Sequence, residues 1–438
     1  MKKSIVIPVY IFCMCFALNL PAQKNKTSVQ DSTLTGKKRS DLPAPYATKS
    51  SRNFSDVIGW ENNSTPVAPA GFTVTKFGEG YDNPRWIYVL PNGDVLVAET
   101  KKIHTGLVKI GAVLVGANKS ESKSEDMRRI LLLRDVDKDG NPDIQTIFLK
   151  DQYLPFGMVV VKDYFYVACT DAVWRYPYKE GQTTITEEGE KILELPAEGR
   201  HWTRNIISNN AGTKLYIAIG SSSNVGENGL NKEKDRARII ETNLDGTGIK
   251  VYASGLRNPV GMDWQPGTDV LWTAVNERDE LGDDLVPDYL TSVKEGAFYG
   301  WPYSYWGANI DPRVKTEEQR PDLTNKAIIP DVDLGSHTAS LGLAFYTKNK
   351  FPAKYFNGVF IGQHGSWNRS VPSGYKVVFV PFEKKKAGKP EDFLTGFMVD
   401  ENKNQVKGRP VGVAVMNDGS LLVADDAGNC VWRVAYGK

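Results

Sequence analysis

The fold is decided by one short apolar pattern that occurs six times: residues 95–98 (VLVA), 165–168 (FYVA), 215–218 (LYIA), 270–273 (VLWT), 359–362 (VFIG) and 421–424 (LLVA). β-Branched and aromatic residues, which favour strands, make up much of each stretch. Turn-forming residues precede several copies, as in 91–94 (PNGD), 266–269 (PGTD) and 417–420 (NDGS). The pattern therefore predicts six copies of one unit built from strands and turns.

A proline stands at a fixed distance before most of these stretches. Pro84, Pro259 and Pro410 each lie 11 residues before the next stretch begins, and Pro155 lies 10 residues before its own. Strand-and-turn repeats spaced roughly 50 to 90 residues apart are typical of β-propellers, in which each four-stranded sheet packs between two neighbours. We predict an all-β, six-bladed β-propeller over residues 69–438. A pair of β-sandwiches or a solenoid is the alternative.

The N-terminal region has the pattern of an export signal. Lys2 and Lys3 precede a mostly apolar run, 5–20, which is followed by Pro21, Ala22 and Gln23. We predict a signal peptide over residues 1–22, with a membrane anchor as the alternative, and a flexible tether over residues 23–68. No later run of about 18 apolar residues occurs, so we expect an exported, periplasmic or extracellular protein without a membrane span in its mature form.

Composition excludes several functional classes. The chain has 438 residues and a formal net charge of +2. Residues 1–53 carry a net charge of +7, so residues 54–438 carry −5, which argues against nucleic acid as a partner. The motifs GxSxG, GxxxxGK[ST], GxGxxG after a strand, HExxH and CxxC are absent, which argues against elbow-type serine hydrolases and Rossmann-type cofactors. Cys169 and Cys430 remain after the predicted signal, and the sequence leaves their pairing open.

Two polar motifs are candidates for a site at one end of the predicted ring. His201 lies in 199–205 (GRHWTRN), shortly before a predicted strand, and is a candidate general base. In 255–261 (GLRNPVG), Arg257 and Asn258 occupy the repeat position that Asn83 and Arg409 hold elsewhere. Converging cationic and amide side chains suit a planar, anionic ligand. The alternatives are a structural histidine and arginines that bind loop carbonyls between blades.

Two acidic stretches are candidates for metal binding. Residues 276–284 (NERDELGDD) form a predicted loop after the fourth apolar stretch. Residues 135–143 (DVDKDGNPD) place Asp135, Asp137, Asp139 and Asp143 at positions 1, 3, 5 and 9, with a glycine at position 6, which is the spacing of a Ca²⁺ loop. Thr146 stands where such a loop has glutamate. A solvated turn is the alternative.

Taken together, 199–205, 255–261, 276–284, 300–302 (GWP) and 408–412 (GRPVG) resemble the glucose/sorbosone dehydrogenase family of quinoprotein six-bladed propellers, from about residue 70 to 437. The resemblance implies that pyrroloquinoline quinone (PQQ) binds over the channel mouth with Ca²⁺. It implies that His201 is the catalytic base and that Arg257 and Asn258 flank the reactive quinone oxygen, where a cation stabilises developing charge.

The same resemblance implies further contacts. Arg85, His364 and Arg409 would contact the quinone, and the backbone carbonyls of Arg278 and Asp279 would bind Ca²⁺. Glucose-oxidising members have a lysine where this chain has His364, so glucose is not singled out as the substrate.

From the resemblance we expect a PQQ-dependent oxidoreductase that removes hydride from a sugar, sugar aldehyde or polyol and passes electrons to a separate acceptor. The alternative is a non-redox, metal-binding propeller, either a lactone hydrolase or a carbohydrate-binding module. A purely structural or adhesive propeller is a third possibility.

Overall fold

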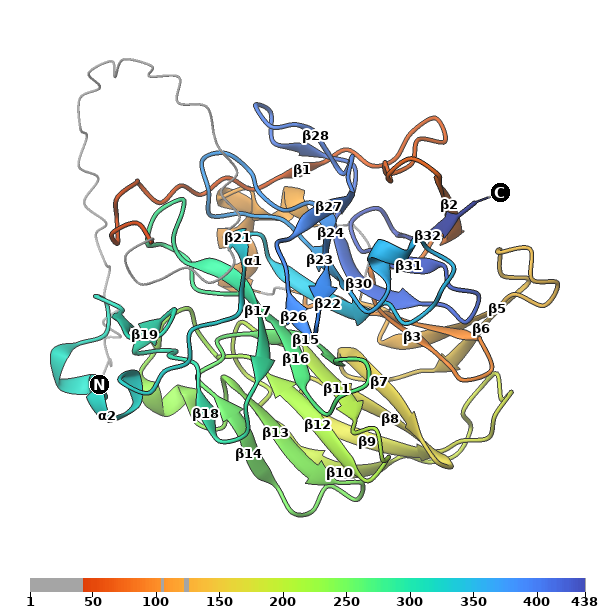
Figure 1. Cartoon of the computed structure of the whole chain (residues 1–438), viewed down its shortest axis with the longest axis horizontal. Coiled ribbons are helices and arrows are strands. Elements are labelled where there is room, and N and C mark those ends of the chain that lie inside the picture. Colours follow the sequence, from red (N-terminus) through yellow and green to blue (C-terminus); the bar gives the residue numbers. More distant parts are fainter. Residues whose placement is uncertain (1–41, 104–105, 122–125, 438) are drawn as a thin grey trace, which may run out of the picture. The chain divides into compact units, whose positions relative to one another are not determined.

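The computed structural model describes residues 42–437 except 104–105 and 122–125 (Figure 1). The predicted signal peptide, 1–22, and residues 23–41 of the predicted tether lie outside the described residues. In the described part of the chain, strands form six larger antiparallel sheets, and helices are few and short. The prediction of an all-β protein is confirmed.

Each larger sheet is built mainly from consecutive strands. The first three sheets contain β3 (Pro84–Val89), β4 (Val95–Glu99), β5 (Arg129–Arg134) and β6 (Ile144–Leu149); β7 (Pro155–Val161), β8 (Tyr164–Cys169), β9 (Ala172–Pro177) and β10 (Glu190–Glu194); and β11 (Arg204–Ser208), β12 (Lys214–Ile219), β13 (Arg238–Asn243) and β14 (Lys250–Ser254). The short strand β18 (Ala297–Phe298) joins the third sheet by pairing parallel to β14.

The other three sheets follow the same plan. They contain β15 (Pro259–Trp264), β16 (Leu271–Val275), β17 (Pro287–Val293) and β21 (Val332–Ser336); β22 (Ser340–Phe345), β23 (Val359–Gln363), β24 (Lys376–Val380) and β27 (Glu391–Leu394); and β30 (Pro410–Val415), β31 (Leu421–Asp425), β32 (Cys430–Tyr436) and β2 (Phe72–Glu79). In the last of these, the N-terminal strand β2 pairs with the C-terminal strand β32, so the two ends of the fold share one sheet.

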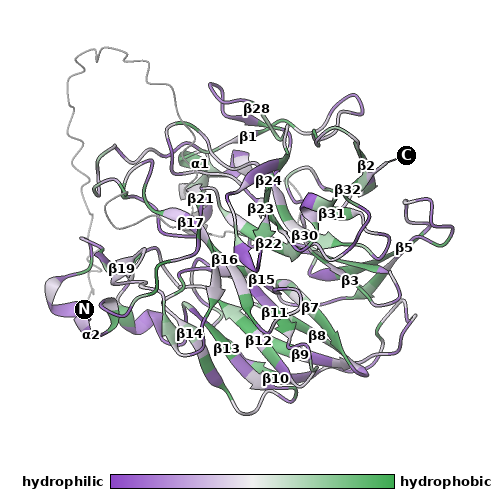
Figure 2. Ribbon diagram, viewed as in Figure 1, coloured by the Kyte–Doolittle hydropathy of each residue, from purple (hydrophilic) through white to green (hydrophobic). Residues whose placement is uncertain are grey.

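The apolar stretches identified in the sequence lie in the second strand of each sheet: β4, β8, β12, β16, β23 and β31. These strands are buried, as in Val95–Glu99, because both faces of each sheet are covered by neighbouring sheets. Figure 2 shows that the hydrophobic residues follow the strands and that the connecting loops are more polar. The predicted repeat is therefore confirmed at the level of its strands.

The first strands of the six sheets contact one another in a cycle. β3 contacts β7, β7 contacts β11, β11 contacts β15, β15 contacts β22, β22 contacts β30, and β30 contacts β3. Glycine makes the closest approaches possible, because a Cβ on Gly342 of β22 would lie 2.1 Å from the carbonyl oxygen of Val411 in β30. The repeated prolines Pro84, Pro155, Pro259 and Pro410 each begin one of these first strands.

Residues 42–68, expected to belong to the tether, bind to the sheets' connecting loops in the structure. β1 (Asp56–Val57) pairs parallel to β29 (Gln405–Val406), which also pairs with β28 (Met398–Asp400). In Figure 1, β1 lies close to β28. Two further small hairpins are β19 (Ser304–Tyr305) with β20 (Asn309–Ile310), and β25 (Phe382–Glu383) with β26 (Lys386–Ala387).

The helical elements are α1 (Gly106–Leu114), α2 (Pro321–Thr324), and the 3₁₀ turns η2 (Ala117–Ser120), η3 (Leu230–Glu233), η4 (Thr316–Glu318) and η5 (Ala353–Tyr355). None of the helices in the described ranges is long and apolar enough to cross a membrane. Cys169 and Cys430 are both buried and do not form a disulfide.

Candidate active site

The repeat gathers polar residues at one end of the sheets. In an antiparallel pair, the start of the first strand and the end of the second strand lie at the same end. His201 and Arg409 precede the first strands β11 and β30, whereas Lys102 and His364 follow the second strands β4 and β23. Strand order therefore brings together residues that are up to about 300 positions apart.

Two adjoining cavities lie among these residues. The larger, of about 740 Å³, is lined by Arg85, His201, Arg257, Asp279 and His364, among others. The smaller, of about 200 Å³, is lined by Arg85, His364 and Arg409. Lys102 and Arg200 line both. Most of the predicted catalytic and quinone-binding residues therefore line one continuous region of suitable size for a small molecule.

The hydrogen bonds of His201 determine its tautomer. Its Nδ1 lies 2.9 Å from both the carbonyl oxygen and the Oγ of Ser221. The Ser221 hydroxyl donates to the carbonyl of Ser223, so both Ser221 oxygens act as acceptors toward the ring. The proton therefore lies on Nδ1, and Nε2 keeps its lone pair.

The electrostatics of His201 also favour the neutral base. Burial and the positive charge of Arg257 hold the pKa of His201 well below its ordinary value. His201 can therefore accept a proton at Nε2 throughout the neutral pH range.

Arg257 is fixed by a dense set of acceptors. Its side chain is 2% exposed and donates to the carbonyl of Glu277 at 2.6 Å, to Asn224 Oδ1 at 2.9 Å and to Asp279 Oδ2 at 3.2 Å. Asp279 in turn lies 3.3 Å from Nδ1 of His337. A fixed cation at the cavity that contains His201 can stabilise negative charge there without reorganisation.

His337 keeps Asp279 ionised. Its Nε2 donates to the carbonyl of Gly282 at 2.8 Å, and its Nδ1 faces the carboxylate, so the protonated ring satisfies both contacts. Burial lowers the pKa of His337, but the hydrogen bond and charge of Asp279 outweigh burial and hold this pKa above its ordinary value. Burial likewise raises the pKa of Asp279, but His337 and Arg257 together hold it below its ordinary value.

Asp426 joins two of the predicted cofactor contacts. Arg85 forms an ion pair with Asp426, and Nε2 of His364 lies 2.9 Å from Asp426 Oδ1. Burial and the charge of Arg409 lower the pKa of His364 to about 3, although Asp426 opposes this shift. His364 is therefore neutral at pH 7 and offers this region hydrogen bonds and no positive charge.

Several cations at this end of the sheets form no ion pair with any described residue. The Arg409 guanidinium donates to the carbonyls of Ser120, His364 and Gly365, and Lys102 donates to the carbonyl of Gly199. Arg409 therefore also fits the alternative considered from the sequence, in which arginines bind loop carbonyls.

Two buried arginines that act electrostatically on Lys102 show the same pattern. Arg204 and Arg236, which share the carbonyl of Pro196, bind only backbone oxygens in the described structure. None of the carboxylates that the structure describes lies within ion-pair distance of Lys102, Arg204, Arg236 or Arg409. Burial and the charges of Arg236 and Arg204 lower the pKa of Lys102. These four cations therefore form no contact ion pair in the described structure, although Asp426, Asp171 and Glu233 act on Arg409, Arg204 and Arg236, respectively, at longer range.

Two predicted site residues, Asn258 and Arg278, do not line either cavity. Asn258 is buried, and its Oδ1 has no hydrogen-bond partner among the described residues. The side chain of Arg278 is also buried and forms ion pairs with Glu277, at 2.9 Å, and with Asp311, at 3.1 Å. The Arg278 side chain therefore stabilises the loop.

The Asp279 carbonyl does not fit its expected role as a Ca²⁺ ligand. This oxygen accepts hydrogen bonds from Asn224 Nδ2 at 3.1 Å and from the Arg313 guanidinium at 2.7 Å. A carbonyl oxygen has two lone pairs, so both are engaged. A cation could bind this oxygen only if one of these donors, including the positively charged Arg313, were displaced.

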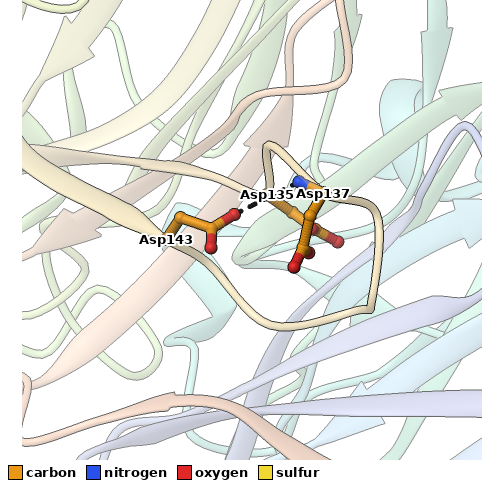
Figure 3. A group of neighbouring side chains, drawn as sticks. All are labelled: Asp135, Asp137 and Asp143. Atoms are coloured by element: carbon orange, nitrogen blue, oxygen red, sulfur yellow. Dashed lines mark hydrogen bonds between the residues drawn. The ribbon is translucent and has the colours of Figure 1, made fainter.

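The second acidic motif lies in the turn between β5 and β6 (Figure 3). None of its residues lines either of the two cavities. Carboxylate oxygens of Asp135, Asp137 and Asp143 lie within 4.8 Å of one another. Asp143 accepts the backbone N–H of Val136 at 2.6 Å, and Asp139 accepts that of Asn141 at 2.7 Å. Asp139 is not among the carboxylates that converge, whereas the other three are close enough to share one ion.

Sequence reasoning missed three residues of this region. Lys102 lies just after a predicted strand, and Asp426 just after another, but neither belongs to a motif that marks it. Ser221 follows the third apolar stretch by three residues, at the same end of its sheet as His201. Its place directly after a second strand was the one available signal.

Comparisons with known proteins agree with this architecture. Residues 66–436 match the family model described as TrAA12-like. An uncharacterized protein of Borreliella burgdorferi is 36% identical over 242 residues, which are 54% of this chain and 61% of that protein. A pyrroloquinoline quinone-dependent pyranose dehydrogenase of Coprinopsis cinerea is 24% identical over 421 residues, covering 83% of this chain and 54% of that protein.

Among solved structures, the calcium structure of Trichoderma reesei Carbohydrate-Active Enzymes Family AA12 matches with a TM-score of 0.69 at 17% identity, covering 86% of this chain and 100% of the other. This likeness concerns the fold. The chain spans between half and two thirds of the length of the two curated relatives above. The matches confirm the resemblance that the motifs indicated, and the extent of the family model shows that the chain belongs to the TrAA12-like family.

Proposed function

We propose that this protein is a PQQ-dependent oxidoreductase that oxidises a sugar, sugar aldehyde or polyol, with His201 as general base. The observation that carries the proposal is a neutral histidine, whose Nε2 has no hydrogen-bond partner in the described structure, in a cavity that Lys102 also lines; Lys102 forms no ion pair with a described carboxylate. The named activity of the Coprinopsis cinerea relative supports the choice of cofactor and substrate class.

The residues present fit a planar quinone with three carboxylates. Lys102 and Arg409 line the cavities without carboxylate partners in the described structure, so an anionic ligand would neutralise them. The Nε of Arg85 is buried and has no hydrogen-bond partner among the described residues. Trp202, whose ring lies 5.3 Å from the Arg85 guanidinium, adds a flat surface to the smaller cavity. Arg85, Lys102 and Arg409 would hold the carboxylates, and His364, whose Nε2 proton faces Asp426, would accept a hydrogen bond at Nδ1.

When bound, the quinone supplies the hydride acceptor. The protein's own contribution begins at His201, whose Nε2 takes the proton of the substrate hydroxyl. Arg257, fixed by Asp279 and Glu277, provides positive charge to the same cavity and stabilises the negative charge that proton removal creates. Asn258, the residue after Arg257, has a buried amide oxygen without a hydrogen-bond partner in the described structure, so this oxygen could accept a hydrogen bond from a ligand.

Of the two predicted Ca²⁺ sites, only the one in the β5–β6 turn is kept as a proposal. The Asp279 carbonyl is occupied by Asn224 and Arg313, so we derive no catalytic step from an ion there. We propose a structural Ca²⁺ in the β5–β6 turn, held by Asp135, Asp137 and Asp143, because their carboxylate oxygens already converge.

The wider architecture is part of the same proposal. The cyclic contacts of the six first strands support a six-bladed β-propeller over residues 69–438, and the proposed tether is kept only for residues 23–41, because residues 42–68 bind to the connecting loops. The charged, apolar and small-residue pattern of residues 1–22 supports a signal peptide and export. A separate protein or small molecule would then reoxidise the cofactor.

Dye-linked turnover tests the proposed activity. Purified protein is incubated with PQQ and Ca²⁺, and reduction of an artificial acceptor is followed over a panel of aldoses, sugar aldehydes and polyols. We expect reduction that requires both the quinone and a substrate from the panel. Quinone-independent hydrolysis of lactones, with no dye reduction by any substrate, would overturn the proposal in favour of a non-redox function.

A further inference from the structure

The segment 46–57 lies against loops of the sheets close to the larger cavity. The backbone N–H of Tyr46 donates to Leu281, in the loop after β16, at 2.7 Å, and that of Asn53 donates to Trp367, in the loop after β23, at 2.8 Å. Further along, the N–H of Asp56 donates to Asn404 at 2.8 Å. Because contacts run along its whole length, the segment has a defined course over these loops.

This segment contributes an aromatic side chain to the larger cavity. Phe54 stacks on Trp367, with ring centroids 5.6 Å apart and an angle of 13° between the rings. Both rings line the cavity that also contains His201 and Arg257. Both are only partly buried, unlike Phe351, Phe360 and Phe393, which pack within the sheets. The pair therefore presents apolar surface to the cavity.

The cavity thus has two kinds of lining. Its lining includes the apolar side chains of Phe54, Trp367 and Leu341 and the polar side chains of His201, Asn276 and Asp279. A pyranose with equatorial hydroxyls has the complementary character, because its C–H bonds form apolar faces and its hydroxyls form a polar rim. An aromatic pair packs against such a face, and the polar groups bind the rim.

We propose that Phe54, together with Trp367, forms the platform on which an aldopyranose with equatorial hydroxyls binds, so that a segment before the first sheet helps to determine substrate affinity. This inference rests on the proposed function for its substrate class. It assigns Phe54 to substrate binding and gives it no role in holding the quinone or in transferring the proton.

The test compares Phe54→Ala with two other variants. Phe54→Tyr keeps the aromatic face, and Ile58→Ala removes an apolar side chain of the same region that is 43% exposed and does not line the cavity. Binding of 1-deoxyglucose, which lacks the anomeric hydroxyl, is measured by calorimetry with and without PQQ. Turnover of glucose gives KM and kcat, and a separate titration gives the affinity for PQQ.

We expect Phe54→Ala to weaken 1-deoxyglucose binding and to raise KM by roughly tenfold, because an aromatic face of this size is lost. Its kcat and PQQ affinity should stay within about twofold of the wild type. Phe54→Tyr and Ile58→Ala should resemble the wild type in all four quantities.

Three results would overturn the inference: no 1-deoxyglucose binding by the wild type, unchanged sugar binding in Phe54→Ala, or a loss of PQQ affinity in that variant that matches the loss of sugar affinity. The first two leave the quinone titration intact, so they would refute the platform without refuting the cofactor. Sugar binding in a protein that takes up no quinone would instead refute the proposed function and retain the platform.

Discussion

Replacement of His201 by alanine tests the proposed chemistry most specifically. The ring is held by Ser221 through Nδ1, so the substitution removes the Nε2 lone pair and leaves the Arg257 network in place. General-base catalysis typically contributes about 10²- to 10⁴-fold to the rate, which corresponds to roughly 3–5 kcal/mol of activation free energy. We expect His201→Ala to lower kcat by about 10²- to 10⁴-fold.

The assay combines turnover with cofactor binding. Stopped-flow or steady-state dye reduction gives kcat for the wild type, His201→Ala and His201→Gln, and an absorbance titration gives the PQQ affinity of each. Affinity should change by less than about threefold, because Lys102, Arg85 and Arg409 remain. Imidazole added to His201→Ala should restore part of the lost rate, since the substitution leaves space for a small base.

The pH profile supplies an independent reading. Burial and Arg257 hold the pKa of His201 well below its ordinary value. The pH profile of the wild-type kcat/KM should therefore contain no inflection near pH 6.5 that arises from His201, so His201→Gln should not remove one. The account of His201 as base would be refuted if His201→Ala kept more than about a tenth of the wild-type kcat. It would also be refuted if PQQ affinity fell in parallel with turnover.

Three further predictions concern stability. His337 has a raised pKa because Asp279 outweighs burial, so its protonated form stabilises the fold below about pH 6.5, and this contribution is lost as the pH rises through the raised pKa. Denaturant unfolding should therefore show a larger loss of stability in His337→Gln at pH 6 than at pH 9. A loss that is the same at both pH values would contradict this. Gly342→Ala should lower the free energy of unfolding by about 1–3 kcal/mol or more, because the new Cβ would lie 2.1 Å from the carbonyl oxygen of Val411. Gly111→Ala, within α1, should leave the stability unchanged or raise it, because its new Cβ would have no atom within 4 Å. Equal shifts of the thermal midpoint in the two variants would argue against close packing of β22 on β30. Ca²⁺ should raise the thermal midpoint of the wild type and not that of Asp143→Asn, and an equal rise in both would exclude the β5–β6 turn as the ion's site.

The sequence predicted those features that depend on local pattern. The six apolar stretches mark the second strand of every sheet because a strand covered on both faces must be apolar throughout, and Pro84, Pro259 and Pro410 mark first strands because proline is tolerated at a strand's first residue. The position of His201 and Arg257 at a common end of the sheets followed from the same repeat.

Other features depend on contacts between distant parts of the chain. His364 is neutral because the charge of Arg409 and burial outweigh Asp426, and no local pattern encodes that balance. The Asp279 carbonyl is occupied because Arg313, 34 positions later, reaches it. Phe54 lines the cavity although composition alone assigns its segment to a tether. In each case the deciding partner lies in a different loop.

The central claim is that Lys102 and Arg409, which form no ion pair in the described structure, bind an anionic quinone, and an equilibrium titration tests it most directly. The purified protein is titrated with PQQ in Ca²⁺-containing buffer by absorbance or calorimetry, alongside Lys102→Gln. The account predicts saturable binding of one quinone per chain, which weakens with added salt and in Lys102→Gln. Absence of saturable binding, or binding that is indifferent to both salt and Lys102, would contradict it.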